Sequence, residues 1–106
     1  MFLAAAAEMS RDQILELVKQ TVLRALADKP AAVYLFGSFA RGEEKPTSDI
    51  DVAIRCEPPL SPETWSDLRA ALNAAGVPRE VELVEITEGD AALISRVQRE
   101  GIVWRE

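Results

Sequence analysis

Hydrophobic residues follow two different spacings along the chain, and these spacings predict which segments are helices and which are strands. Apolar residues recur every three to four positions after Ser10, Ser61 and Thr87, and each of these hydroxyl residues can cap the helix that follows it. Three short apolar runs have instead the length and composition of strands. The predicted order is helix 10–29, strand 31–36, one helical turn 38–41, strand 49–54, helix 61–76, strand 80–86, helix 87–100 and a possible final strand at 102–104.

The connection between the first two strands is short. It contains about one helical turn, whereas a parallel crossover usually needs a dozen or more residues with a full helix, so these two strands need not be parallel. We therefore predict an α+β fold, a small mixed β-sheet backed by helices on one face. Because side chains alternate along a strand, Asp49 and Asp51 share a face, which we expect to be open.

Length and composition limit the possible functions. The chain has 106 residues and predicts one domain at 10–106, preceded by a frayed leader at 1–9. A net charge of -6 argues against stable nucleic-acid binding, and no apolar run is long enough for a membrane span. The chain has no histidine, which excludes histidine bases and ligands, and its one cysteine fits a reducing cytoplasm.

The chemistry is concentrated between the first two strands. Carboxylates such as Asp49 and Asp51, two apart on a strand, can hold the same hard cation. The turn at Gly37 and Ser38 offers backbone N–H groups and a hydroxyl, which suit a phosphate. Gly37 could also simply end a strand, and Ser38 could cap the short helix. Together, the two pairs favour an enzyme that handles nucleoside triphosphates.

This arrangement resembles a known family. Gly37-Ser38, ten intervening residues and Asp49-Ile50-Asp51 resemble the signature of the DNA polymerase β-like nucleotidyltransferase superfamily. With Arg41-Gly42 and the small size, the chain looks like the minimal nucleotidyltransferases, the MNT-type antitoxins encoded beside HEPN-domain toxins. The resemblance implies the polymerase β-like fold, ATP bound through Gly37 and Ser38, and two Mg²⁺ ions held by Asp49, Asp51 and a third carboxylate.

The third carboxylate departs from the family pattern. The matching residue on the neighbouring strand is Glu82, where the family usually has Asp. The extra methylene moves the carboxylate by about an ångström, and such a displacement can cost on the order of a hundredfold in rate. Glu82 is therefore either a working metal ligand with a longer reach or the sign of a weakened enzyme.

Three residues near the signature have open interpretations. Arg41 could reach the triphosphate as a nucleotide-binding residue, or it could pair with Glu43 or Glu44 at the surface. We expect Ser48 to brace the loop before the second strand. Phe39 could pack beneath this loop or stack on a base.

Three functions fit these residues. The leading hypothesis, implied by the resemblance, is transfer of AMP from ATP to a hydroxyl, a tyrosine, of a partner HEPN toxin. The second is a catalytically weakened antitoxin that neutralises the toxin by binding alone. The third is nucleotidyl transfer to a small molecule or RNA, although this chain has no further domain for such an acceptor and its acidic charge counts against tRNA.

Overall fold

The computed structural model describes residues 9–106 and divides into two compact units. One unit combines the described residues up to Lys29 with Leu60–Pro78, and the other combines Pro30–Pro59 with Arg79–Glu106. The predicted leader at 1–9 lies, except for Met9, outside the described residues. The boundaries proposed for one domain at 10–106 stay a prediction.

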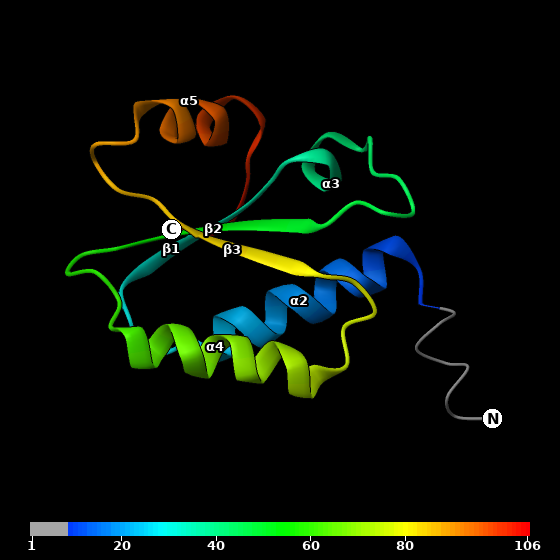
Figure 1. Cartoon of the computed structure of the whole chain (residues 1–106), viewed down its shortest axis with the longest axis horizontal. Coiled ribbons are helices and arrows are strands. Elements are labelled where there is room, and N and C mark those ends of the chain that lie inside the picture. The colour runs from blue at the N-terminus through cyan, green and yellow to red at the C-terminus, as the bar shows by residue number, and fades with distance from the viewer. Residues whose placement is uncertain (1–8) are drawn as a thin grey trace. The chain divides into compact units, whose positions relative to one another are not determined.

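The first unit consists of two capped helices that contact each other (Figure 1). Helix α2 spans Arg11–Ala25 and begins with a reciprocal capping box, in which Ser10 accepts from the Gln13 N–H and Gln13 accepts from the Ser10 N–H. Helix α4 spans Pro62–Ala75, is capped by Ser61, and ends at Gly76 in the left-handed conformation. Both predicted starts are confirmed.

The second unit is built on a four-stranded mixed sheet in the order β3-β2-β1-β4. Strand β1 pairs antiparallel with both β2 and β4, and β2 pairs parallel with β3. The predicted fold class and the possible last strand are therefore confirmed, and the first two strands, which the short connection left free not to be parallel, are antiparallel. The strands are β1 Ala31–Phe36, β2 Ile50–Cys56, β3 Val81–Glu85 and β4 Ile102–Arg105.

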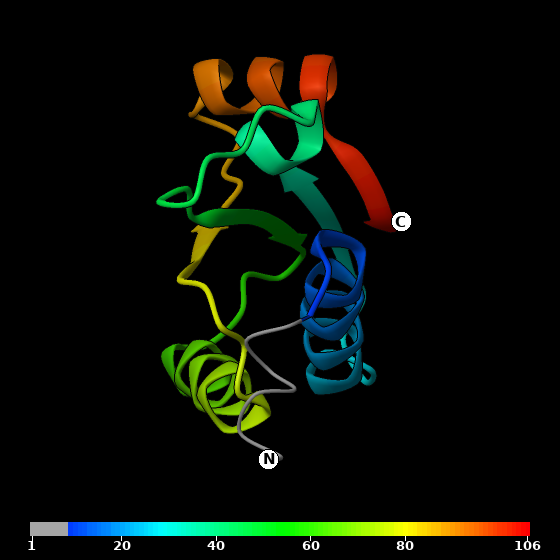
Figure 2. The ribbon, with the colours of Figure 1, turned by 90° about the vertical axis from the view of Figure 1, so that its right-hand side faces the viewer.

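Both helices of this unit, α3 (Ser38–Arg41) and α5 (Ala91–Glu100), lie on one face of the sheet (Figures 1 and 2). Val97 of α5 forms a buried cluster with Phe36 of β1 and Ala53 of β2. This is the face that carries Asp51, since Asp51 and Ala53 are two apart on β2. The expectation of an open carboxylate face was wrong over this part of the sheet, because the apolar residues on the same face attract a helix.

The start of α5 also differs from the prediction. Its N-cap is Asp90, whose side chain accepts from the Leu93 N–H, and not Thr87. Thr87 and Asp90 both lie between β3 and α5. Asp90 takes the cap position because it directly precedes the apolar residues of the helix. In the part of the chain that the structure describes, no helix is long and apolar enough to span a membrane.

Candidate functional site

The bend at Gly37 connects β1 to α3 and approaches β2 closely. Gly37 has φ +80°, a conformation that favours glycine, and a Cβ at this position would collide with the carboxylate of Asp51. The strand register explains this approach, since Phe36, the last residue of β1, pairs with Asp51. Glycine is therefore required here both by its backbone conformation and by its distance from Asp51.

The three predicted metal ligands come from two adjacent segments. Asp51 of β2 and Glu82 of β3 are register partners on parallel strands, so their Cα atoms are neighbours. Asp49 lies directly before β2, and it is exposed, as is Glu82, whereas Asp51 is half-buried. The register thus brings Asp51 and Glu82 side by side, with Asp49 near the same end of the sheet.

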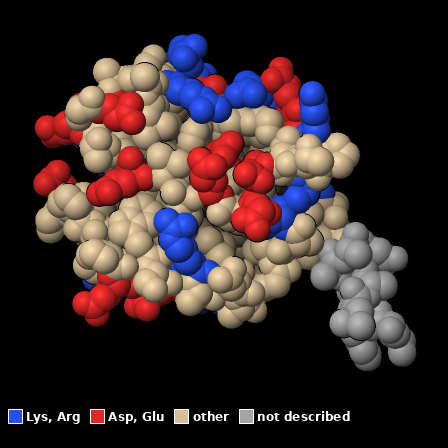
Figure 3. All heavy atoms as spheres, viewed as in Figure 1, with Lys and Arg blue, Asp and Glu red and all other residues tan. Residues whose placement is uncertain are grey.

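Asp51 lies in an electrostatically unfavourable environment. Desolvation by burial raises its pKa, and the negative charges of Glu82, Asp49 and Glu100 raise it further, whereas Arg96 acts in the opposite direction. Figure 3 shows a group of acidic side chains near the centre of the view, with basic side chains beside it. A cation placed at Asp51 would relieve both the repulsion and the loss of hydration.

Asp49, Asp51 and Glu82 have the chemistry of Mg²⁺ ligands, although their side chains do not converge on one point. Carboxylate oxygens are the hard ligands that Mg²⁺ prefers, and the pKa of Asp51 is raised first by desolvation and then by neighbouring carboxylates, both of which a bound cation would counteract. Among residues 9–106, no three aspartate, glutamate or cysteine side chains converge closely enough to hold a metal ion. The three-ligand site therefore stays a prediction.

Ser38 and Arg41 lie on the short helix that follows the bend. Gly37 takes the N-cap position of α3, so Ser38 is not the cap and is instead the first helical residue. Arg41 donates to Glu43 at 2.7 Å and to Glu100 at 2.8 Å. The surface pairing of Arg41 with Glu43 is thus confirmed, and its contact with a triphosphate stays a prediction. The pKa of Arg41 is raised, first by its hydrogen bond to Glu43 and further by the charges of Glu100 and Glu43.

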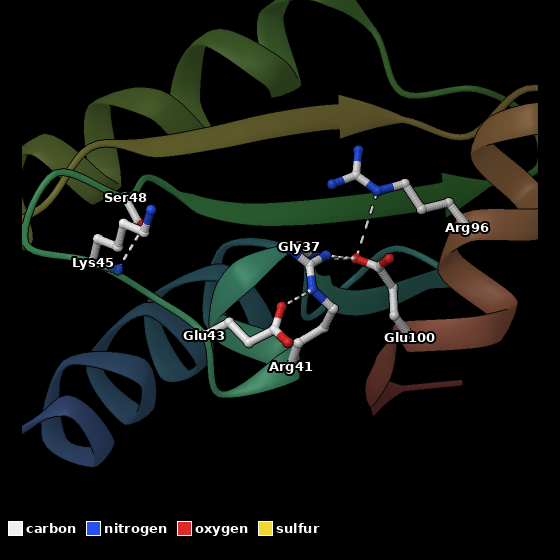
Figure 4. Close-up of polar contacts among 7 residues, drawn as sticks. All are labelled: Gly37, Arg41, Glu43, Lys45, Ser48, Arg96 and Glu100. Carbon is white, nitrogen blue, oxygen red and sulfur yellow. Dashed lines mark hydrogen bonds and ion pairs between the residues drawn. The ribbon is translucent and has the colours of Figure 1, made fainter.

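A residue that the sequence analysis missed, Glu100, lies against the bend. Its Oε2 accepts from the Gly37 N–H at 2.7 Å and from Arg41 Nη1 at 2.8 Å, and it lies 3.5 Å from Nε of Arg96 (Figure 4). Arg96 in turn lies over the Phe36 ring, 5.1 Å from its centroid. Desolvation would raise the pKa of Glu100, but the Gly37 N–H, Arg41 and Arg96 together hold it below its usual value.

The loop between α3 and β2 is held by hydrogen bonds. The Ser48 hydroxyl accepts from the Lys45 N–H at 2.8 Å, which confirms its predicted bracing role (Figure 4). Arg79 donates to the carbonyls of Lys45 and Ser48 and lies over the Phe39 ring. Phe39 is 1% exposed, so it packs in the core and is not available to stack on a base. These hydrogen bonds therefore fix the backbone of the loop directly before Asp49.

A family model described as "Polymerase beta, Nucleotidyltransferase" matches residues 13–104. The protein adenylyltransferase MntA of Shewanella oneidensis is 26% identical over 94 residues, which cover 89% of this chain and 63% of that relative. The chain therefore spans less than two thirds of the length of this relative.

Two solved structures share the fold. One is described as a minimal nucleotidyltransferase, with a TM-score of 0.69 and 28% identity over 90% of this chain and 96% of that chain. The other is a toxin–antitoxin with AMP-PNP, with a TM-score of 0.65 and 26% identity over 81% of this chain and 71% of that chain. Both likenesses agree with the mixed sheet.

Proposed function

Because the chain belongs to the polymerase beta nucleotidyltransferase family, we propose that it is an MNT-type antitoxin that transfers AMP from ATP to a hydroxyl of a HEPN-domain toxin. The relative MntA is named a protein adenylyltransferase, and a solved toxin–antitoxin contains an ATP analogue. These two likenesses support a nucleotide substrate and a protein acceptor. We propose a tyrosine as the acceptor and the cytoplasm as the compartment, which suits ATP and the free thiol of Cys56.

One observation carries the proposal: the Gly37 bend lies directly against the half-buried Asp51, with Glu82 beside it in register. This arrangement places a backbone bend suited to phosphate next to carboxylates suited to a cation, which is what a metal-bound triphosphate requires. The raised pKa of Asp51 supports the same interpretation, since its causes, desolvation first and the charge of Glu82 next, are both ones that a bound cation would offset.

The residues have distinct roles in the proposed reaction. Asp49, Asp51 and Glu82 would hold Mg²⁺, which when bound neutralises phosphate charge and stabilises the pyrophosphate that leaves. Ser38 and the bend orient the β- and γ-phosphates, and Arg41 contributes a positive charge beside them. The acceptor hydroxyl attacks the α-phosphorus in line, so the work of this chain is positioning and electrostatic stabilisation.

A second function is a binding antitoxin without turnover. The specific observation in its favour is Glu82, which is exposed and replaces the shorter aspartate of the family, and no three-carboxylate cluster forms among the described residues. On this hypothesis, the chain neutralises the toxin by complex formation alone.

Incubation with ATP labelled at the α-phosphate separates the two functions. The reaction contains Mg²⁺ and a HEPN-domain toxin as the acceptor protein. We expect label on the partner, with loss of labelling in Asp51→Asn and in EDTA. Stable complex formation without label would overturn the enzyme and favour the binding antitoxin. Glu82→Asp tests the third ligand, since transfer should hold or rise if Glu82 occupies that position.

A further inference from the structure

Glu100 lies against the Gly37 bend because strand β4, which follows it, pairs with β1 in the sheet. Strand β4 pairs antiparallel with β1, and Leu35 is the partner of Ile102. Continuing this register by two residues, past the end of β1, places Glu100 opposite Gly37, where the 2.7 Å hydrogen bond is found. The sheet therefore fixes which side chain meets the bend.

The helix on the other side fixes Glu100 as well. Glu100 is the last residue of α5, and Val97 one turn earlier is buried against the sheet. Gly101 then turns the chain into β4 with its N–H bonded to the Val97 carbonyl, and a Cβ on Gly101 would collide with that oxygen. The backbone of Glu100 is thus held between a packed helix and a paired strand.

Two hydrogen-bond donors and one further ion-pair partner converge on one oxygen of Glu100, and they come from three different parts of the chain. They are the Gly37 N–H after β1, the Arg41 guanidinium on α3 and the Arg96 guanidinium on α5. Two guanidinium groups that approach one oxygen repel each other, and the carboxylate between them offsets this repulsion. Both arginines are partly exposed, with side-chain exposures of 39% and 46%, whereas that of Glu100 is 15%. The Glu100 carboxylate is thus less exposed than the two guanidinium groups that pair with it beside the bend.

We propose that Glu100 is the positioning residue of the polyphosphate site, which fixes the Gly37 bend and holds Arg41 and Arg96 together as the cations that receive the phosphates of the nucleotide. Arginine side chains lose conformational entropy when they bind a phosphate, and a carboxylate that already orders them lowers this cost. This inference rests on the proposed function and adds to it Glu100 and Arg96.

Titration calorimetry on the full chain with Mg²⁺ and ATP, ADP or AMP tests the proposal. Glu100→Ala should weaken ATP binding about tenfold, which corresponds to about 1.4 kcal/mol. Glu100→Gln should be intermediate, because its amide oxygen can still accept from Gly37 but carries no charge for the arginines. The loss should be largest for ATP and smallest for AMP, since the displaced groups contact phosphates.

Two further variants complete the series. Arg96→Ala should show the same dependence on phosphate number, with ATP affected most. Glu43→Gln is the matched control, because it removes the same charge and one of the two acidic partners of Arg41, yet leaves the contacts of Glu100 with Gly37, Arg41 and Arg96 in place. We expect its ATP affinity to stay within about twofold of the wild-type value.

Any of the following calorimetric results would overturn the proposed role of Glu100. Tighter ATP binding by Glu100→Gln would mean that the carboxylate competes with phosphate for the site. An equal loss for ATP and AMP would mean a general structural defect, and an unchanged affinity would mean that Glu100 has no part in binding. If the wild-type chain itself takes up no ATP, the proposed function fails as well, which distinguishes that failure from the failure of this inference alone.

Discussion

Two carboxylates flank the Gly37 bend, and their environments are opposite. Glu100 receives the Gly37 N–H and two guanidinium groups, and its pKa is lowered despite burial. Asp51 is half-buried against the same glycine among other acids, and its pKa is raised. One side of the bend is therefore electrostatically satisfied by the protein alone, and the other side has an excess of negative charge.

This difference indicates which groups serve structure and which serve a ligand. A carboxylate that accepts two hydrogen bonds and pairs with a second guanidinium group stabilises the fold and gains little from an added cation. A desolvated carboxylate near like charges destabilises the fold, and such a group is common where a ligand supplies the missing charge. On the proposed function, we therefore expect the cation at Asp51 and the support of the bend from Glu100.

The largest expected effect is the loss of transfer in Asp51→Asn. If Asp51 holds the cation, AMP transfer should fall by on the order of a thousandfold, since the neutral amide is a weak ligand for Mg²⁺. Labelling of the HEPN partner measures this change. Asp67→Asn, an exposed aspartate of α4, is the control and should retain full transfer. Transfer by Asp51→Asn within tenfold of the wild type would remove Asp51 from the site.

The next largest effect concerns the glycine between the two carboxylates. Gly37 and Gly42 both have positive φ, at +80° and +71°, but a Cβ at Gly42 meets nothing within 4 Å. Gly42→Ala should therefore cost about 1 kcal/mol of unfolding free energy, from backbone strain alone. Gly37→Ala should cost at least about 1 kcal/mol more and also lower ATP binding, because the new methyl displaces Asp51. Urea unfolding of both variants measures the difference, and equal costs would contradict the close approach.

The sequence predicted the Asp51 side of this comparison and missed the Glu100 side. Asp49, Asp51 and Gly37 lie within one local pattern, so spacing alone was sufficient to select them. Glu100 is 63 residues from Gly37, and it reaches the bend only through the pairing of β4 with β1. A possible last strand was predicted, but its partner was not, because strand pairing is a long-range choice with no local signal.

The same limit explains the covered carboxylate face. Ala53, two residues after Asp51, is fully buried under α5. Alternation on a strand predicted that Asp49, Asp51 and Ala53 share a face, and the two acids suggested that this face is open. The sequence pattern predicted α5 as a helix. It did not predict that α5 packs over the apolar part of this face, since that contact is long-range.

A smaller effect of opposite sign is expected for the stability of two isosteric variants. At neutral pH, Asp51→Asn should raise the free energy of unfolding and Glu100→Gln should lower it, each by about 1 kcal/mol or less. The unfolding temperature should move in the same direction as the free energy in each variant. Asp51 has a raised pKa, so its ionised form costs stability, and this cost grows as pH rises through its folded pKa. Glu100 has a lowered pKa, so its contribution is present above its unfolded pKa and is lost as pH falls through its folded pKa.

Thermal unfolding of both variants across pH 3–8 measures these signs. The difference between each variant and the wild type should shrink toward the acidic end, as the carboxyl groups become protonated. A lower midpoint for Asp51→Asn at neutral pH would mean that Asp51 is a structural residue, and the contrast between the two carboxylates would be lost.

The smallest expected effect belongs to Glu43, the other partner of Arg41. The Arg41–Glu43 pair is short, at 2.7 Å, but the two side chains are 39% and 66% exposed, whereas Glu100 is 15% exposed. Exposed ion pairs are screened by water and salt, so Glu43→Gln should change the unfolding free energy by less than about 0.5 kcal/mol. The effect should shrink further in 1 M salt, whereas that of Glu100→Gln should persist, because its hydrogen bond to Gly37 is less accessible. A cost for Glu43→Gln equal to that for Glu100→Gln would mean that burial and the Gly37 contact do not distinguish these two acids, and that Arg41 alone determines the contribution of each.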